Sequence, residues 1–303
     1  MSSLPSYVVV TPARNEARFI EGTMQSVAAQ DLLPLKWVIV SDGSTDGTDE
    51  IVQRYAAQYP WIELLRMPER AERHFAGKAY AIRAAMERLQ ELPYQAVASL
   101  DADITFESGY FAFLLGKLAQ DAQLGVVGTP FVDVVGESYD YRYVSRDHVS
   151  GTCQLFRRRC FEEIGGFTPV KGGAIDTIAV VSARMKGWKT RTFTEMHSHH
   201  HRVMGTAESS PLQARFVLGC RDYAVGNHPL WELFRVLYQM GQRPYLLRGL
   251  ALGAGYLRSS IKGVQRPVSK DFVAFFRREQ MQRLRQALAR RIFPWRKKAQ
   301  DEA

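Results

Sequence analysis

Short runs of β-branched and other apolar residues alternate with longer stretches of helical periodicity along the first hundred residues. Runs of this length predict strands, and an apolar spacing of three and four residues predicts helices. The regular alternation indicates βαβ units around a mostly parallel sheet with helices on both faces. The predicted strands are Tyr7–Val10, Trp37–Val40, Ile62–Leu65 and Ala96–Leu100, and the predicted helices are Arg18–Gln30, Thr48–Tyr59 and Lys78–Glu91.

The second half of the chain has a more mixed pattern that ends in helices. Cys160–Ile164 and Asp176–Lys186 read as helices, each stopped by glycine. Gln213–Met240 is a long, aromatic helical stretch, and further helices are expected after it. The change in character predicts a first domain over residues 1–210 and a helical C-terminal region over residues 211–303.

Polar clusters follow three of the predicted strands at their carboxyl ends. These clusters are Thr11–Glu16, Ser41–Thr48 and Asp101–Asp103. In open α/β sheets, ligands bind beyond the carboxyl ends of the strands. The sequence therefore predicts a binding site at this edge of the sheet.

The cluster Ser41–Thr48 is a glycine-rich acidic turn between a strand and a helix. Asp42 at the strand end can accept hydrogen bonds from a base or ribose, and the small residues let a ligand approach the backbone. A plain turn with Ser44 or Thr48 capping the next helix explains the same residues. The turn alone does not choose between these interpretations.

Asp101 and Asp103 place two carboxylates at positions i and i+2 after a buried strand. Such a pair can hold Mg²⁺ or Mn²⁺ together with substrate phosphates. The metal would then neutralise a leaving diphosphate. A solvated acidic turn is the alternative interpretation.

Four motifs in this order resemble the family 2 glycosyltransferases, in particular bacterial exopolysaccharide and surface-glycan transferases. They are Thr11–Glu16, Ser41–Thr48, Gly77-Lys78 and Leu100–Asp103, and the resemblance covers roughly the first 190 residues. It implies the GT-A nucleotide-sugar-binding fold, an α/β class with a mostly parallel central sheet flanked by helices, here with a C-terminal helical extension. The implied activity is inverting, metal-dependent transfer of a sugar, of the hexosyltransferase type, from a nucleotide-diphosphate-sugar donor to a glycan or lipid-linked acceptor.

The resemblance also implies roles for individual residues. Lys78 would bring a positive charge to the donor, Asp101 would face the ribose or the metal, and Asp103 would bind Mg²⁺ or Mn²⁺ directly. The residues expected at the base-binding end are Pro12, Arg14, Glu16 and Asp42.

Inversion needs a general base that deprotonates the acceptor hydroxyl. The resemblance places this base at Asp176, after the glycine-rich loop that begins at Gly172. Ile175 stands where the family usually has a glutamate, and Asp176 as a helix N-cap is the competing interpretation.

The run from His197 to Arg202 contains four histidines and ends in an arginine. Related enzymes often have a metal-binding histidine here, and neutral imidazole suits Mn²⁺. We expect His201 and His199 to be metal ligands and at least two of the four histidines to be exposed. Arg202 is expected to contact the donor diphosphate.

The net charge of +9 is concentrated near the C-terminus, because residues 265–298 carry eleven Lys or Arg and two acids, or 11 − 2 = +9. A basic amphipathic helix suits an anionic membrane surface. Packing on the catalytic domain explains the pattern equally well, and a nucleic-acid partner is not expected because no base-reading module is present. The apolar side consists of Met281, Leu284, Leu288 and Ile292, extended by Phe293 and Trp295, and the arginines opposite include Arg283, Arg290 and Arg291.

The three cysteines form no closely spaced pair, and the first residues lack a basic segment followed by an apolar run. The predicted location is cytoplasmic, peripheral at the inner face of the plasma membrane. Two alternatives stay open: a polyprenyl-phosphate sugar synthase, and a non-catalytic scaffold that retains the fold, which Ile175 in place of an acid makes conceivable.

Overall fold

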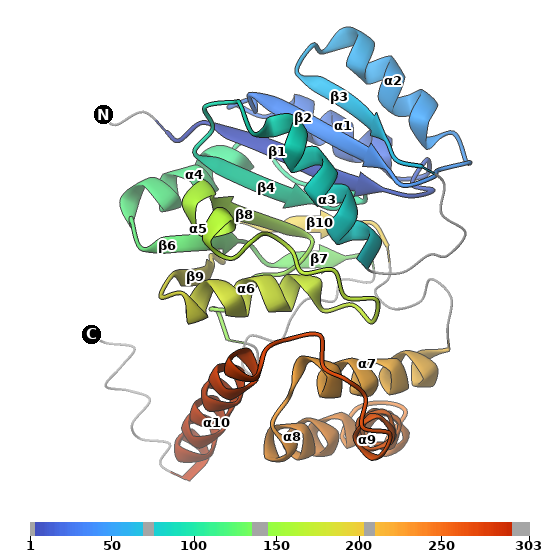
Figure 1. Cartoon of the computed structure of the whole chain (residues 1–303), viewed down its shortest axis with the longest axis vertical. Helices are drawn as coiled ribbons and strands as arrows, with labels where there is room; N and C mark the ends of the chain where they lie inside the picture. The colour runs from blue at the N-terminus through green and yellow to red at the C-terminus, as the bar shows by residue number, and fades with distance from the viewer. Residues whose placement is uncertain (1–3, 69–75, 135–144, 203–209, 293–303) are drawn as a thin grey trace. The chain divides into compact units, whose positions relative to one another are not determined.

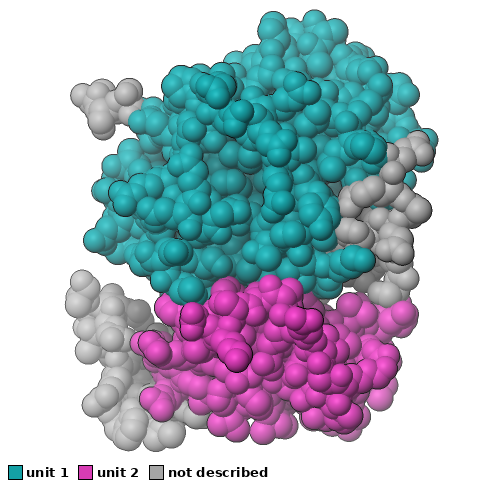
Figure 2. Space-filling model, in the orientation of Figure 1, with its two compact units in different colours: residues 1–204 teal, residues 205–303 magenta. Residues whose placement is uncertain are grey.

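The computed structural model describes residues 4–68, 76–134, 145–202 and 210–292. The chain forms two compact units, residues 1–204 and residues 205–303 (Figure 2). The predicted domain boundary at residue 210 stays a prediction.

A seven-stranded sheet forms the centre of the first unit, in the order β3-β2-β1-β4-β8-β6-β9 (Figure 1). Its pairs are parallel except for β8, which runs antiparallel to both β4 and β6. The predicted mostly parallel sheet is therefore confirmed. The strands are β1 (Tyr7–Ala13), β2 (Lys36–Ser41), β3 (Ile62–Arg66), β4 (Ala96–Leu100), β6 (Leu124–Gly128), β8 (Cys153–Arg157) and β9 (Lys189–Thr192).

Helices cover this sheet because their apolar faces and the continuous apolar strands can be buried only against each other. Trp37, Tyr110 and Phe111 are among the largest fully buried side chains of this core. The predicted helical flanks are confirmed. The helices of the unit are α1 (Ile20–Ala28), α2 (Thr48–Gln58), α3 (Ala76–Leu89), α4 (Tyr110–Gln120), α5 (Arg158–Glu163) and α6 (Ile175–Met185).

A second, three-stranded sheet contains β5 (Ile104–Thr105), β10 (Ser198–His200) and β7 (Phe131–Asp133). β10 lies between the other two, antiparallel to β5 and parallel to β7. The register pairs His200 with Ile104, the residue after Asp103. This small sheet thus brings the histidine run to the acidic turn after β4.

The second unit consists of helices. The long helical stretch predicted over residues 213–240 is divided near Gly226, which has a left-handed φ of 96°, and Pro229 then opens the next helix. Glycine suits such a C-terminal position and proline suits the first turn. No helix in the described part of the chain is both long and apolar enough to cross a bilayer. The helices are α7 (Pro211–Val225), α8 (Pro229–Met240), α9 (Leu247–Ile261) and α10 (Lys270–Ile292).

Candidate functional site

The loops after β1 and β2 are joined by hydrogen bonds between their backbones and short polar side chains. Asn15, in the left-handed region with a φ of 56°, accepts a hydrogen bond at Oδ1 from the Thr45 N–H at 2.9 Å. The Asn15 N–H donates to Ser44 Oγ at 3.2 Å, and the Glu16 N–H donates to Thr48 Oγ1 at 2.8 Å. The two polar clusters seen in the sequence therefore form one rigid rim.

Asp46 completes this rim from the second loop. Its carboxylate accepts hydrogen bonds from the Ala17 N–H at 3.0 Å and from the Thr48 N–H at 3.1 Å. Burial alone would raise the pKa of Asp46, but the hydrogen bonds from Thr48 and Ala17 outweigh it and lower the pKa. Asp46 is thus an anion that holds the loop together.

The residues predicted at the base-binding end lie together on this rim. Pro12 sits in β1 opposite Val40, and the buried Asp42 donates its N–H to the Ala13 carbonyl at 2.9 Å. Arg14 Nη1 lies 3.8 Å from Asp42 Oδ2. A cation and a carboxylate at a strand end can orient a polar ligand, so the geometry suits the predicted role without testing it.

Lys78 lies between two of the predicted acidic site residues. Its Nζ is 2.8 Å from Asp101 Oδ1 and 3.2 Å from Asp176 Oδ1. Burial opposes charge on this lysine, but the two carboxylates outweigh it and raise the pKa of Lys78. Burial together with neighbouring Asp176 and Asp103 raises the pKa of Asp101 to about 6, although Lys78 partly offsets them. The cation therefore allows two acids to occupy one small volume.

Gly151 makes room for this arrangement. Lys78 Nζ donates to the Gly151 carbonyl at 3.2 Å. A Cβ built on Gly151 would lie 2.4 Å from Asp176 Cγ, which is far inside van der Waals contact. Only glycine at this position leaves space for the Asp176 carboxylate, a requirement that the sequence analysis missed.

Asp176 lies in the first turn of α6, and the N-cap position is taken by Ala174, whose φ is 65°. Ala174 has no side chain that can cap the helix. The side chain of Asp176 instead faces Lys78. Ile175, at the position where the resemblance led us to expect a glutamate, is buried in the core. Asp176 is therefore not the helix N-cap, and its role as general base stays a prediction.

Asp103 is the centre of a second charged group. Its Oδ2 lies 3.4 Å from His200 Nε2 and 3.3 Å from Arg202 Nε, and Arg202 also pairs with Glu16. Burial would raise the pKa of Asp103, but the hydrogen bond and charge of His200 and the charge of Arg202 lower it. Burial would lower the pKa of His200, but the hydrogen bond to Asp103 and the charge of Asp103 outweigh burial and raise this pKa. The pair Arg202–Glu16 connects this group to the rim formed by the β1 loop.

Asp103 and His200 suit a divalent cation. Carboxylate oxygen and imidazole nitrogen are ligands of Mn²⁺, and adjacent ligands of a six-coordinate ion at about 2.1 Å lie about 3 Å apart. The 3.4 Å separation of His200 Nε2 from Asp103 Oδ2 is close to that spacing. No three His, Cys, Asp or Glu side chains in the described part of the chain form a complete cage. Donor phosphates and water would have to supply the remaining ligands, as is usual for Mg²⁺.

The two histidines predicted as ligands lie elsewhere. His199 points to the opposite face of β10 from His200 and is exposed, with its ring 5.0 Å from that of His197. His201 Nε2 lies 2.8 Å from Thr105 Oγ1, and its N–H donates to the Asp103 carbonyl at 3.0 Å. The structure therefore brings His200, which the sequence analysis passed over, to the Asp103 carboxylate. Ligation by His199 and His201 stays a prediction that the geometry does not favour.

Thr23 is a second residue that the sequence analysis missed. Its buried hydroxyl donates to the Ala102 carbonyl at 2.8 Å and accepts from the Ile104 N–H at 3.1 Å. Both bonds fix the turn that carries Asp101 and Asp103. A threonine inside a helix gives no sequence signal for such a contact.

Comparison with known families identifies the chain. Residues 8–165 match the sequence profile of the family described as Glycosyl transferase family 2, which is just over half of the chain. The chain belongs to glycosyl transferase family 2. The family region runs from within β1 to beyond β8 and contains Asp42, Lys78, Asp101 and Asp103.

Two bacterial relatives and one solved structure illustrate the similarity. A Bacillus subtilis protein named as a teichuronic acid biosynthesis glycosyltransferase, TuaG, is 36% identical over 99 residues, which cover 33% of this chain and 36% of TuaG. The Bacillus subtilis glycosyltransferase YdaM is 25% identical over 218 residues, which cover 64% of this chain and 50% of YdaM. The chain thus spans about half or less of the length of these relatives.

The solved structure is a mannosyltransferase from Pyrobaculum calidifontis, PcManGT, in complex with GDP-Man and Mn²⁺. It superposes with a TM-score of 0.59 at 21% identity, over 97% of this chain and 88% of that one. At this identity the likeness supports the fold, which confirms the predicted GT-A class.

Proposed function

We propose that the chain is an inverting, metal-dependent glycosyltransferase that moves a hexosyl group from a nucleotide-diphosphate-sugar donor to a glycan or lipid-linked acceptor. One observation carries this proposal. The acceptor-side acid Asp176 shares Lys78 with Asp101, and the metal-side acid Asp103 follows Asp101 by two residues. The residues proposed as base, donor contact and metal ligand thus lie together at one edge of the sheet, which supports the proposal.

In this proposal the donor lies along the rim after β1 and β2. Pro12, Arg14 and Asp42 hold the base and ribose, and Arg202 contacts the diphosphate with Glu16 keeping it in place. PcManGT, which has the same fold, binds GDP-Man and Mn²⁺. That likeness supports a nucleotide-sugar donor for this chain.

Asp103 and His200 would hold Mg²⁺ or Mn²⁺, which supplies charge neutralisation for the leaving diphosphate when it is bound. Lys78 fixes the orientation of the Asp176 carboxylate through the 3.2 Å ion pair. Asp176 takes the proton of the acceptor hydroxyl while that oxygen forms a bond to the anomeric carbon. The bond from this carbon to the diphosphate oxygen breaks on the opposite side, so the nucleoside diphosphate leaves and the configuration inverts.

The acceptor and location remain those expected from the sequence. TuaG is named for teichuronic acid biosynthesis, which supports a bacterial surface polysaccharide as the product. We propose that the enzyme works at the cytoplasmic face of the membrane, with the basic tail near anionic lipid.

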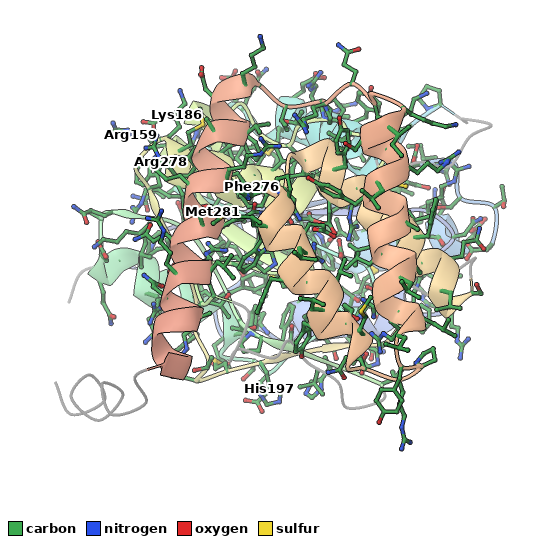
Figure 3. The ribbon with its side chains drawn as sticks, turned by 90° about the horizontal axis from the view of Figure 1, so that it is seen from below. Arg159, Lys186, His197, Phe276, Arg278 and Met281 are labelled. Atoms are coloured by element: carbon green, nitrogen blue, oxygen red, sulfur yellow. The ribbon has the colours of Figure 1, made fainter. Side chains whose placement is uncertain are left out.

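In α10, Phe276 is buried and turned toward α8 while Arg278 points away (Figure 3). The predicted apolar stripe continues along α10 to Leu288 and Ile292, whose side chains are outside the described part of the chain. Phe293 and Trp295 are also outside the described part.

Donor turnover tests this function. Purified protein with Mn²⁺ would be given a panel of UDP-, GDP- and dTDP-sugars, and release of the nucleoside diphosphate and the anomeric configuration of the sugar product would be followed by NMR. We expect one donor to be consumed with inversion, and Asp176→Asn to slow turnover by at least about 100-fold, the usual size of general base catalysis. Nucleotide binding without turnover of any donor, with acceptor glycans present, would favour the scaffold alternative. A product of retained configuration would contradict inversion.

A further inference from the structure

Helix α8 has its amphipathic character reversed. Leu230, Leu233 and Leu237 recur at intervals of three and four residues and are all more than half exposed, Leu237 at 60%. The only acid of the helix, Glu232, is 3% exposed and pairs with Arg235. A helix of a water-soluble domain normally does the opposite and buries its leucines. The outer face of α8 is therefore an apolar surface.

Helix α9 shows the same reversal. Leu250, Leu257 and Ile261 lie on one stripe of the helix and are exposed, Ile261 at 85%. The inward face contains small residues instead. A Cβ built on Gly255 would lie 2.0 Å from the Phe216 carbonyl of α7, so the two backbones nearly touch at this glycine. The small residues thus let α9 approach α7 closely, and the leucines of α9 stay on the outer side.

The connection between the two helices continues this surface. Tyr245 and Leu246 in the link, and Leu247 at the start of α9, are each at least half exposed. α8 and α9 pack against each other and lie side by side in Figures 1 and 3. We define the α8–α9 surface as the exposed side chains Leu230, Leu233, Leu237, Tyr245, Leu246, Leu247, Leu250, Leu257 and Ile261.

The exposed charges of α8, the link and α9 have a single sign. The one acid of this segment, Glu232, is buried and pairs with Arg235. Arg243, Arg258 and Lys262 are exposed beside the apolar side chains. An apolar face whose own exposed charges are all cations is complementary to an anionic lipid bilayer, where leucines enter the acyl region and cations meet the headgroups.

We propose that the α8–α9 surface docks the protein on an anionic lipid bilayer. Each helix lies in the interface, since neither is long and apolar enough to span. A second copy of the chain is a poorer occupant, because a self-complementary contact would place these cations opposite each other without an acid to pair them. The inference deepens the proposed work at a membrane and moves the main contact from the basic tail to α8 and α9.

Vesicle flotation with the full-length protein and no nucleotide tests the proposal. Vesicles of phosphatidylcholine alone would be compared with vesicles that also contain phosphatidylglycerol. We expect binding to the anionic vesicles, and a loss of at least about tenfold in the paired variant Leu237→Glu/Leu257→Glu, because two exposed leucines that would enter the lipid are replaced by charges that the lipid repels. The matched control is Leu33→Glu/Leu35→Glu, which changes two comparably exposed leucines of the first unit and should float like wild type.

Two further variants separate the possible contacts. Arg243→Gln/Arg258→Gln should weaken binding to anionic vesicles, whereas Arg290→Gln/Arg291→Gln tests the tail and should have the smaller effect. Equal flotation of wild type and Leu237→Glu/Leu257→Glu would overturn the proposal, and so would loss only in the tail variant. A concentration-dependent dimer that the leucine variant abolishes, without flotation of wild type, would show that a second copy covers the surface. Melting temperature and nucleotide binding of every variant, measured separately, distinguish failure of docking from misfolding or from failure of the proposed activity.

Discussion

Lys78 and Asp176 form an ion pair of 3.2 Å between the first turns of α3 and α6, on the same lysine that contacts Asp101 at 2.8 Å. One cation therefore neutralises two carboxylates from different parts of the chain. The relationship explains how a general base and a donor-binding acid can be neighbours in a partly buried site.

Removal of this cation should destabilise the first unit. In Lys78→Met the carboxylates of Asp101 and Asp176 face each other without compensation, and we expect the free energy of unfolding to fall by about 1–3 kcal/mol at neutral pH. Urea unfolding of the variant measures the change. The double variant Lys78→Met/Asp101→Asn removes one of the two like charges and should regain part of the loss. Equal stability of wild type and Lys78→Met would mean that the pair has no energetic role.

Space at Gly151 should be essential for turnover. Gly151→Ala places a Cβ only 2.4 Å from Asp176 Cγ, so the carboxylate must move. We expect a drop in kcat of about 100-fold, because a displaced base loses its reach to the acceptor. Metal-dependent nucleotide binding should change little. Gly172→Ala is the matched control, since its Cβ would meet nothing within 4 Å, and a similar kcat in both variants would contradict this account.

His200, rather than His199, should affect the metal. His200→Ala removes the imidazole that faces Asp103 at 3.4 Å, and we expect the apparent Mn²⁺ affinity in the presence of nucleotide to fall by about 10- to 100-fold. Mn²⁺ titration followed by electron paramagnetic resonance gives this affinity directly. His199→Ala and His201→Ala are the controls, and a larger loss in either of them than in His200→Ala would restore the ligands expected from the sequence.

Glu232 should make the second unit less stable as the pH rises. Burial and neighbouring Asp222 raise the pKa of Glu232 from its ordinary 4.5 to about 7, although Arg235 partly offsets them. The folded chain therefore holds a proton that the unfolded chain has lost between pH 4.5 and about 7, so the unfolding free energy decreases across that window and is level above it.

Glu232→Gln should flatten this dependence, because the amide of glutamine does not titrate. The variant should keep its local structure, since the amide oxygen can still accept from Asn227, which donates to Glu232 Oε2 at 3.0 Å. Melting temperatures at about pH 5 and about pH 8 measure the effect. Asp271→Asn, at an exposed acid of α10, should keep the slope of wild type. The same slope in wild type and Glu232→Gln would be evidence against the assignment.

The sheet, its parallel strands and the edge that holds the site could be predicted from the sequence, because buried parallel strands appear as continuous apolar runs. Asp101, Lys78 and Asp176 were singled out by their motifs, and the structure places their side chains together, while their roles stay predictions. The register of β10 could not be predicted. Successive side chains of a strand alternate between its two faces, and four histidines in a short run do not show which of them face the site. That is why His199 was expected where the structure has His200.

Contacts made by residues without a motif were also beyond the sequence. Gly151 is needed only because a Cβ at this position would overlap the Asp176 carboxylate, and Thr23 matters only because its hydroxyl binds the turn after β4. The exposed leucines of α8 look like an ordinary amphipathic stripe in the sequence. Only the structure shows that Glu232 is on the buried side.

Nucleotide binding tests the central claim most directly. Melting temperature would be measured for wild type and Asp103→Ala with UDP, GDP and dTDP, each with Mn²⁺, with Mg²⁺ and with neither metal. The account predicts that one nucleotide raises the melting temperature of wild type only when a metal is present, and that Asp103→Ala, compared with its own melting temperature without ligand, shows no such increase. Stabilisation that is equal in Asp103→Ala, or equal without metal, would contradict a metal-dependent donor site at Asp103.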